Sequence, residues 1–281
     1  MDNVLVEAVG MDALNGGAIA AYQGMLRAAR PGNALGALSQ DELLARLGAA
    51  GVSADGLSHP TRAGLLMFGD EYQIVKEFPD YFLDYRDESS GGGWGERVVS
   101  NDGEWSGCVF DFWRTVLPRL LAAVGAVGTA GAAGAAGAPS APRHFAADAL
   151  PETLLHKAVR EAFANALVHA DYRGKRYVVV VRGADRITFS NPGRMLAGGG
   201  DMRGGVSDAR NPTLVKMFSL VNACERAGRG LAVIRQAGER AALLAPRLLE
   251  SADPERTELT IYLGAAPAPV PGGELFARSL G

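Results

Sequence analysis

The feature that most constrains the fold is the stretch 161–172, EAFANALVHADY, together with the residues just before it. Apolar residues recur there three and four positions apart, which is typical of a helix with one face against a core. That apolar face consists of Leu155, Val159, Ala162, Phe163, Ala166 and Leu167. The rest of the chain is therefore predicted to be organised around this helix.

The polar face of the same helix carries Glu161, Asn165 and His169, each four residues from the next. A carboxylate can orient or deprotonate a water, and a carboxamide oxygen is a hard ligand that Mg²⁺ accepts. This arrangement suits a site for magnesium and phosphate. The alternative is an amphipathic helix with a solvated polar edge, which is the norm on globular helices.

Two β-rich runs follow this helix. Residues 177–182 and 186–190 predict a hairpin that turns at Gly183-Ala184-Asp185, and Asn191-Pro192-Gly193 then turns the chain again. Residues 257–263 alternate apolar and polar side chains and predict a last strand.

The region between these strands is rich in glycine. Residues 196–211 are predicted to form a long mobile loop, and loops of this length in a compact domain are usually either functional lids or disordered segments. Asn211 followed by Pro212 predicts a helix over about 213–223, with Asn211 as its cap. Another helix is predicted to continue to about residue 249. Gly228 and Gly230 stand at its start, where glycines either let the backbone approach a phosphate or serve as a helix stop.

The N-terminal part combines short helices and strands. Ser39 and Glu42 form a capping box for a helix that ends at Gly48, and Thr61 is a plausible cap for a helix over 63–68. The remaining predicted elements are a helix around 19–27, strands at 81–86 and 97–100, and an aromatic-rich helix at 109–124. The helical spacing of those aromatic residues favours core positions over base stacking.

An Ala/Gly-rich run at 125–142 divides the chain, because it offers little side chain to bury. The predicted organisation is an N-terminal segment at 1–124, a linker at 125–142, a domain at 143–264 and a flexible tail at 265–281. The two larger parts could still share one sheet.

The composition of the chain excludes few classes of protein function. The net charge of −3 gives no global nucleic-acid footprint, so contact with DNA would need a local patch. One basic patch either faces phosphates or DNA or is a solvated surface. It comprises Arg143, Lys157, Arg160, Arg173, Lys175 and Arg176. Cys108 and Cys224 form no metal-type pair, and neither a signal peptide nor a membrane span is apparent, so a cytoplasmic location is predicted.

Four segments keep a common order: REAFANALVHADYRG, RITFSNPGRM, SDARNPTLVKMF and ERAGRGL. With this order the chain resembles the C-terminal ATPase-like region of bacterial RecG-related transcriptional regulators, a divergent branch of the GHKL ATP-binding superfamily. The resemblance covers about residues 150–237, and LSQDELLARLG, PTRAGLLMFG and FPDYFLDYRD resemble the segment that precedes this region. It implies an α/β (α+β) fold, a two-layer sandwich of GHKL (Bergerat) type with a smaller helical and β N-terminal part.

The resemblance also implies roles for individual residues. Asn165 matches the asparagine that ligates Mg²⁺, and Glu161 matches the acid that activates water in hydrolytic members. Asn191 and Gly193 fall in the first glycine box, which meets the adenine. ATP and Mg²⁺ are accordingly the implied cofactors.

The remaining matches concern the phosphates. Gly228 and Gly230 match the second glycine box, and Arg210 and Asn211 would close on the nucleotide from the lid, with Arg210 as a phosphate clamp. The chain departs from the superfamily in offering Asn191 where an aspartate is usual, and in a short lid and second box. ATP binding is therefore expected, with weak hydrolysis at most.

The resemblance implies a transcription-regulatory role with DNA or a protein as partner, and leaves oligomerisation open. The alternative is a non-catalytic interaction or DNA-regulatory module that keeps the fold without binding nucleotide. Relatives typically begin with a Schlafen-AlbA-type module, and this sequence begins just after where that module would end. A truncated, inactive gene product is therefore a further expectation, and a misassigned start is its alternative.

Overall fold

The computed structural model describes residues 2–90, 95–130, 154–195, 209–224, 232, 234–236 and 244–263. Its helices are η1 Met11–Ala13, α1 Gly16–Ala29, η2 Ala34–Ala37, α2 Gln40–Leu47, α3 Arg62–Phe68, α4 Glu71–Glu77, α5 Val109–Ala130, α6 Leu154–Val168 and α7 Pro212–Leu220. Its strands are β1 Ala50–Val52, β2 Ser58–Pro60, β3 Leu83–Asp87, β4 Arg97–Val99, β5 Val178–Arg182, β6 Arg186–Pro192, β7 Arg247–Ala252 and β8 Glu255–Tyr262. The prediction of a mixed α and β fold is confirmed.

The main sheet contains six strands in the order β4-β3-β5-β6-β8-β7. β3 pairs in parallel with β5, and the other pairs are antiparallel. β3 and β4 precede the Ala/Gly-rich run and the other four strands follow it, so both parts of the chain contribute to one sheet.

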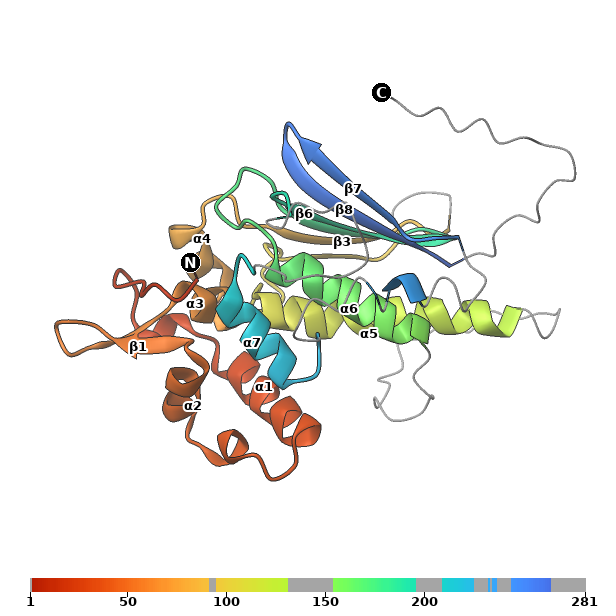
Figure 1. Cartoon of the computed structure of the whole chain (residues 1–281). Helices are drawn as coiled ribbons and strands as arrows, with labels where there is room; N and C mark the ends of the chain where they lie inside the picture. The colour runs from red at the N-terminus through yellow and green to blue at the C-terminus, as the bar shows by residue number, and fades with distance from the viewer. Residues whose placement is uncertain are drawn as a thin grey trace, which may run out of the picture.

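Helices α5 and α6 lie side by side against one face of this sheet (Figure 1). The ring of Phe163 on α6 lies 5.7 Å from that of Phe112 on α5 and 6.1 Å from that of Phe189 on β6. These contacts fix the orientation of α6. They turn the apolar face that the sequence predicts toward α5 and the sheet. Glu161 and Asn165 are consequently carried at the boundary of the core.

The N-terminal helices pack on the far side of α5 (Figure 1). Tyr22 of α1 makes edge contacts with Phe68 and Phe110, with ring centroids 5.3 and 5.4 Å apart. Its hydroxyl donates to the carbonyl of Met217 at 2.9 Å. A buried hydroxyl needs such an acceptor, so this bond fixes α7 against the N-terminal part.

Several local predictions are confirmed. The Ser39 and Glu42 capping box makes both of its bonds, and the Thr61 side chain accepts from the backbone of Gly64. Other elements were missed or wrong. The β1–β2 hairpin and α4 were not predicted, and residues 247–249, predicted as the end of a helix, belong to strand β7, because they pair with β8.

Candidate functional site

The polar face of α6 is placed as the sequence spacing requires. Glu161 is buried, with 6% of its surface exposed, and Asn165 and His169 are partly exposed. Glu161 therefore stands at the deep end of this face, while Asn165 can reach solvent or a ligand. The carboxamide of Asn165 offers one oxygen donor, which fits Mg²⁺ because that ion usually takes only one or two protein ligands and completes its shell with phosphate oxygens and waters.

Three segments meet at the carboxyl end of α6: residues 168–171, the end of β6 at 191–194, and residues 210–211 at the start of α7. The backbone N–H of Asp171 donates to the carbonyl of Pro192 at 2.9 Å, which ties the helix end to the strand end. Asn191 is buried and its amide donates to the same carbonyl at 3.2 Å.

Gly193 has a φ of +88°, a backbone conformation that favours glycine. Its carbonyl accepts from the Thr257 hydroxyl at 2.8 Å and its N–H donates to the carbonyl of Glu255 at 3.1 Å. A Cβ at this position would lie 2.0 Å from Nη1 of Arg210, so the guanidinium occupies the space left by the missing side chain.

The place where these three segments meet, at the carboxyl end of α6, is called the junction below. Arg210 and Asn211 donate to backbone carbonyls there. Arg210 donates to the carbonyls of His169 at 3.3 Å and Arg194 at 3.1 Å. Asn211 is buried and donates to the carbonyls of Val168 at 3.0 Å and Ala170 at 2.8 Å. These donors satisfy carbonyls at the end of α6, and the Arg210 charge is favourable at this negative end of the helix dipole.

Burial lowers the pKa of His169, and the nearby charge of Arg210 lowers it further. The imidazole is therefore neutral at neutral pH. A neutral ring beside a guanidinium leaves the positive charge of Arg210 as the local electrostatic feature of the junction.

The predicted cap of α7 is wrong in detail. Asn211 makes no side-chain cap bond, because its amide is turned toward α6. Instead, Oδ2 of Asp2 accepts from the backbone N–H groups of Thr213 at 2.9 Å and Leu214 at 3.0 Å. No sequence signal could have identified Asp2, since it lies 211 residues away along the chain.

The structure thus brings Asn191, Gly193, Arg210 and Asn211 together at the carboxyl end of the helix that carries Glu161 and Asn165. Gly228, Gly230 and residues 196–208 of the predicted lid lie outside the described residues. Within the described ranges, no group of three or more His, Cys, Asp or Glu residues is arranged to hold a metal ion.

Comparison with known proteins gives matches to two family models. Residues 1–84 match the family "Domain of unknown function (DUF8451)". Residues 176–261 match the family HATPase_c_4, described as "Putative ATP-dependent DNA helicase recG C-terminal". No curated protein matches. None of the helices in the described part of the chain is both long and apolar enough to cross a membrane.

Among solved structures, the chain is similar to the DIP2311 protein from Corynebacterium diphtheriae, with a TM-score of 0.62 and 20% identity. The match covers 95% of this chain and 47% of that one, so this chain spans about half the length of the matched protein. At this identity the likeness concerns the fold. The family match supports an ATPase-like region in the part of the chain that holds β5, β6, α7, β7 and β8.

Proposed function

We propose that this protein binds Mg²⁺-ATP at the carboxyl end of α6, in a two-layer fold of the GHKL type. The observation that carries the proposal is the contact of Arg210 with the end of α6 and the end of β6. Arg210 and β6 lie within residues 176–261, which match an ATPase-like family, and α6 precedes that region. The order of elements, a polar-faced helix, a hairpin, a glycine-rich segment and a further helix, agrees with that assignment.

In this proposal Asn165 supplies the protein ligand to Mg²⁺, which offsets phosphate charge when bound. Glu161 positions a water, and its burial keeps it in one orientation. Asn191 and Gly193 face the adenine, and Gly228 and Gly230 supply backbone donors to the phosphates. Hydrolysis is expected to be weak at most.

Arg210 fits the role of phosphate clamp because its present acceptors are neutral carbonyls at 3.1 and 3.3 Å. A phosphate oxygen forms a shorter and stronger bond with a guanidinium than a carbonyl does. The side chain can therefore exchange these carbonyls for a nucleotide. Asn211, whose amide has two close carbonyl acceptors, would stay in place and hold α7 to α6.

A thermal shift with Mg²⁺ plus ATP, ADP or GTP tests the proposal. A ligand at about 100 times its dissociation constant stabilises a protein by about 2.7 kcal/mol, so the shift is easily measured. Asn165→Ala should remove an ATP-specific shift, whereas Lys157→Ala, an exposed position on the same helix, should not. Unchanged nucleotide affinity in Asn165→Ala would reject the site.

We also propose that the protein acts in the cytoplasm in a regulatory role, with the nucleotide changing contacts to DNA or a protein partner. The predicted domain at 143–264 and tail at 265–281 belong to this proposal, whereas the boundary predicted at residue 124 falls inside α5, which continues to Ala130. The alternative is a non-catalytic module. The hydrogen bonds of Arg210 and Asn211 favour this alternative, because both side chains donate to backbone carbonyls and so have a structural role. Intact partner binding without any nucleotide effect on melting would decide for that alternative.

A further inference from the structure

A cavity of about 280 Å³ lies on the face of the sheet opposite α6. Val180 and Phe189 pair in register and face the helices, so Val179 and Val181 face the other way. These two valines line the cavity together with Arg86, Arg176, Tyr177 and Arg256. The cavity is thus separate from the site proposed for ATP, and of its six lining residues three carry positive charge and none is acidic.

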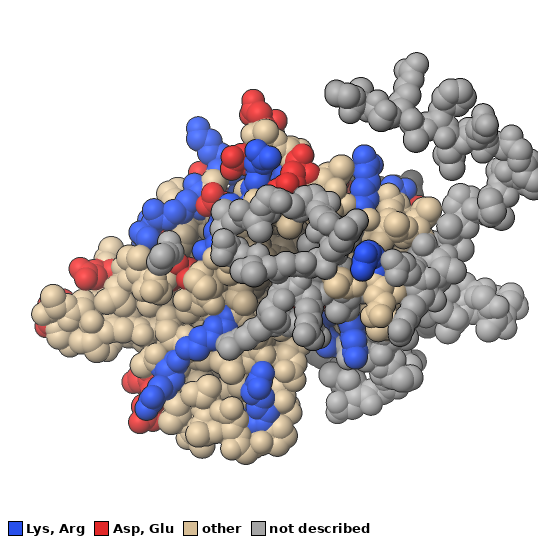
Figure 2. All heavy atoms as spheres, viewed as in Figure 1, with Lys and Arg blue, Asp and Glu red and all other residues tan. Residues whose placement is uncertain are grey.

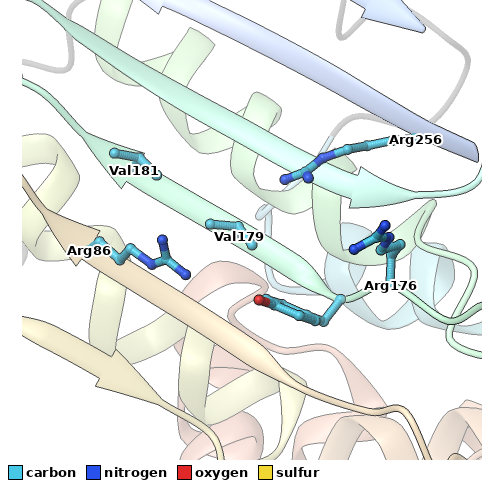
Figure 3. Close-up of a pocket in the computed structure, with 6 residues that line it drawn as sticks. Arg86, Arg176, Val179, Val181 and Arg256 are labelled. Atoms are coloured by element: carbon cyan, nitrogen blue, oxygen red, sulfur yellow. The ribbon is translucent and has the colours of Figure 1, made fainter. Parts of the chain in front are cut away.

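The three guanidinium groups point into the space beside Val179 (Figure 3). Two of them are held in position by neighbours. Arg86 donates twice to Oδ2 of the fully buried Asp84, at 2.8 and 2.6 Å, and Arg256 bonds to the hydroxyl of Ser190. Donors fixed in this way lose little conformational entropy when they bind an anion.

The positive charge continues across the sheet. Strand pairing places one outward-facing row in register from β4 to β7: Arg97, Arg86, Val181, Thr188, Thr260 and Arg247. The hydroxyls of Thr188 and Thr260 lie 3.4 Å apart in the middle of this row. Since neighbouring strands are about 4.8 Å apart, Arg86 and Arg247 are separated by roughly 19 Å.

Acidic side chains on this face are fewer and partly neutralised. Asp84 is bound by both Arg86 and Arg97. Glu258 lies in the next cross-strand row, which also contains Asp84 and the cavity residue Val179. Arg176 and Arg247 are exposed and form no ion pair with a described residue. In the view of Figure 2, basic and acidic side chains are mixed above the sheet, so attraction for a polyanion depends on this local row.

We propose that this face, comprising the cavity and the arginine row, binds single-stranded nucleic acid. The separation of the cations exceeds what one phosphate can bridge, whereas a phosphodiester strand presents a series of charges. Tyr177 is 37% exposed and its ring packs edge-on against Phe82 with centroids 4.9 Å apart, so it offers a supported surface for base stacking. An acidic peptide would meet the charges but does not require an exposed aromatic surface.

Fluorescence anisotropy with a labelled single-stranded oligonucleotide tests the proposal across a salt series. The double variant Arg176→Ala/Arg247→Ala should bind roughly tenfold more weakly or worse at low salt. Its slope of log affinity against log salt should be shallower by about 1.4, since each lost phosphate contact removes about 0.7. Arg46→Ala, an exposed arginine on α2, should bind as the wild type does.

Equal binding by the double variant and the wild type, or no binding at all, would overturn the proposal. Displacement of the strand by pyrophosphate or a mononucleotide at equal phosphate concentration would assign the cavity to a small phosphorylated ligand instead. Unaltered melting of the double variant shows that it folds. Asn165→Ala should retain strand binding, so failure of the ATP site and failure of this surface are distinguished.

Discussion

Nη1 of Arg210 occupies the position where a side chain at Gly193 would begin, since a Cβ there would lie 2.0 Å away. The glycine therefore does two things at once: it adopts a φ of +88° and it leaves room for a guanidinium that bonds to the carbonyls of His169 and Arg194. This pair couples the end of β6 to the start of α7.

Gly193→Ala should destabilise the protein. The backbone conformation alone costs a residue with a side chain about 1–3 kcal/mol, and Arg210 must also move. Urea unfolding measures the loss, with Gly183→Ala as the control, because a Cβ there would meet atoms only at 3.5 Å. Adding Arg210→Ala should restore part of the stability lost; a double variant that loses the sum of both effects would contradict the contact.

Asn211→Ala should lower the free energy of unfolding by about 1–3 kcal/mol, because the carbonyls of Val168, the last residue of α6, and of Ala170 just beyond it lose their donor. Asn211→Asp should be worse, since a carboxylate would then face those carbonyl oxygens. The exposed Asn101→Ala serves as the control in the same denaturation series. A tolerated Asn211→Asp would show that the amide does not hold the helix end.

Asp2→Ala should destabilise the protein by about 1–2 kcal/mol, the usual cost of losing a helix cap. The two N–H groups at Thr213 and Leu214 would lose their shared acceptor. Asp41→Ala, an exposed position in the first turn of α2, should have little effect. Hydrogen exchange at residues 213 and 214 gives a local readout, and unchanged protection there would argue against the cap.

The stability of the wild type should fall as the pH is lowered below about 6.5. The pKa of His169 is lowered in the folded state, so the unfolded chain takes up a proton at a higher pH than the folded one does. The loss is complete below the folded pKa and absent at alkaline pH. His169→Gln should flatten this part of the stability curve.

The pKa of His169 also tests the contribution of Arg210. Arg210→Ala removes the second cause of the lowered pKa, so the pKa of His169, followed by NMR, should move up toward its ordinary value in that variant. A pKa that does not move would show that burial alone sets it.

Local sequence patterns were sufficient for several elements whose partners are near in the chain, although not for the β1–β2 hairpin. The capping box of Ser39 and Glu42, the cap at Thr61 and the β5–β6 hairpin involve residues a few positions apart. The same holds for α6, whose apolar spacing placed Phe163 in the core and Asn165 at its edge. In these cases hydrogen bonds and periodicity within one element decide the outcome.

Distant partners decided the rest. Residues 247–249 form a strand because they pair with β8. The Asn211 side chain turns away from its own helix because carbonyls at the end of α6 accept from it, and Asp2 caps α7 instead. The outward row of arginines is equally invisible in the sequence, because strand pairing sets its register. The sequence by itself determined α6, the β5–β6 hairpin and the capped helices α2 and α3, and it determined which polar residues share the face of α6. Only the tertiary structure decided which backbone donors and acceptors those residues satisfy, because these partners lie far away along the chain.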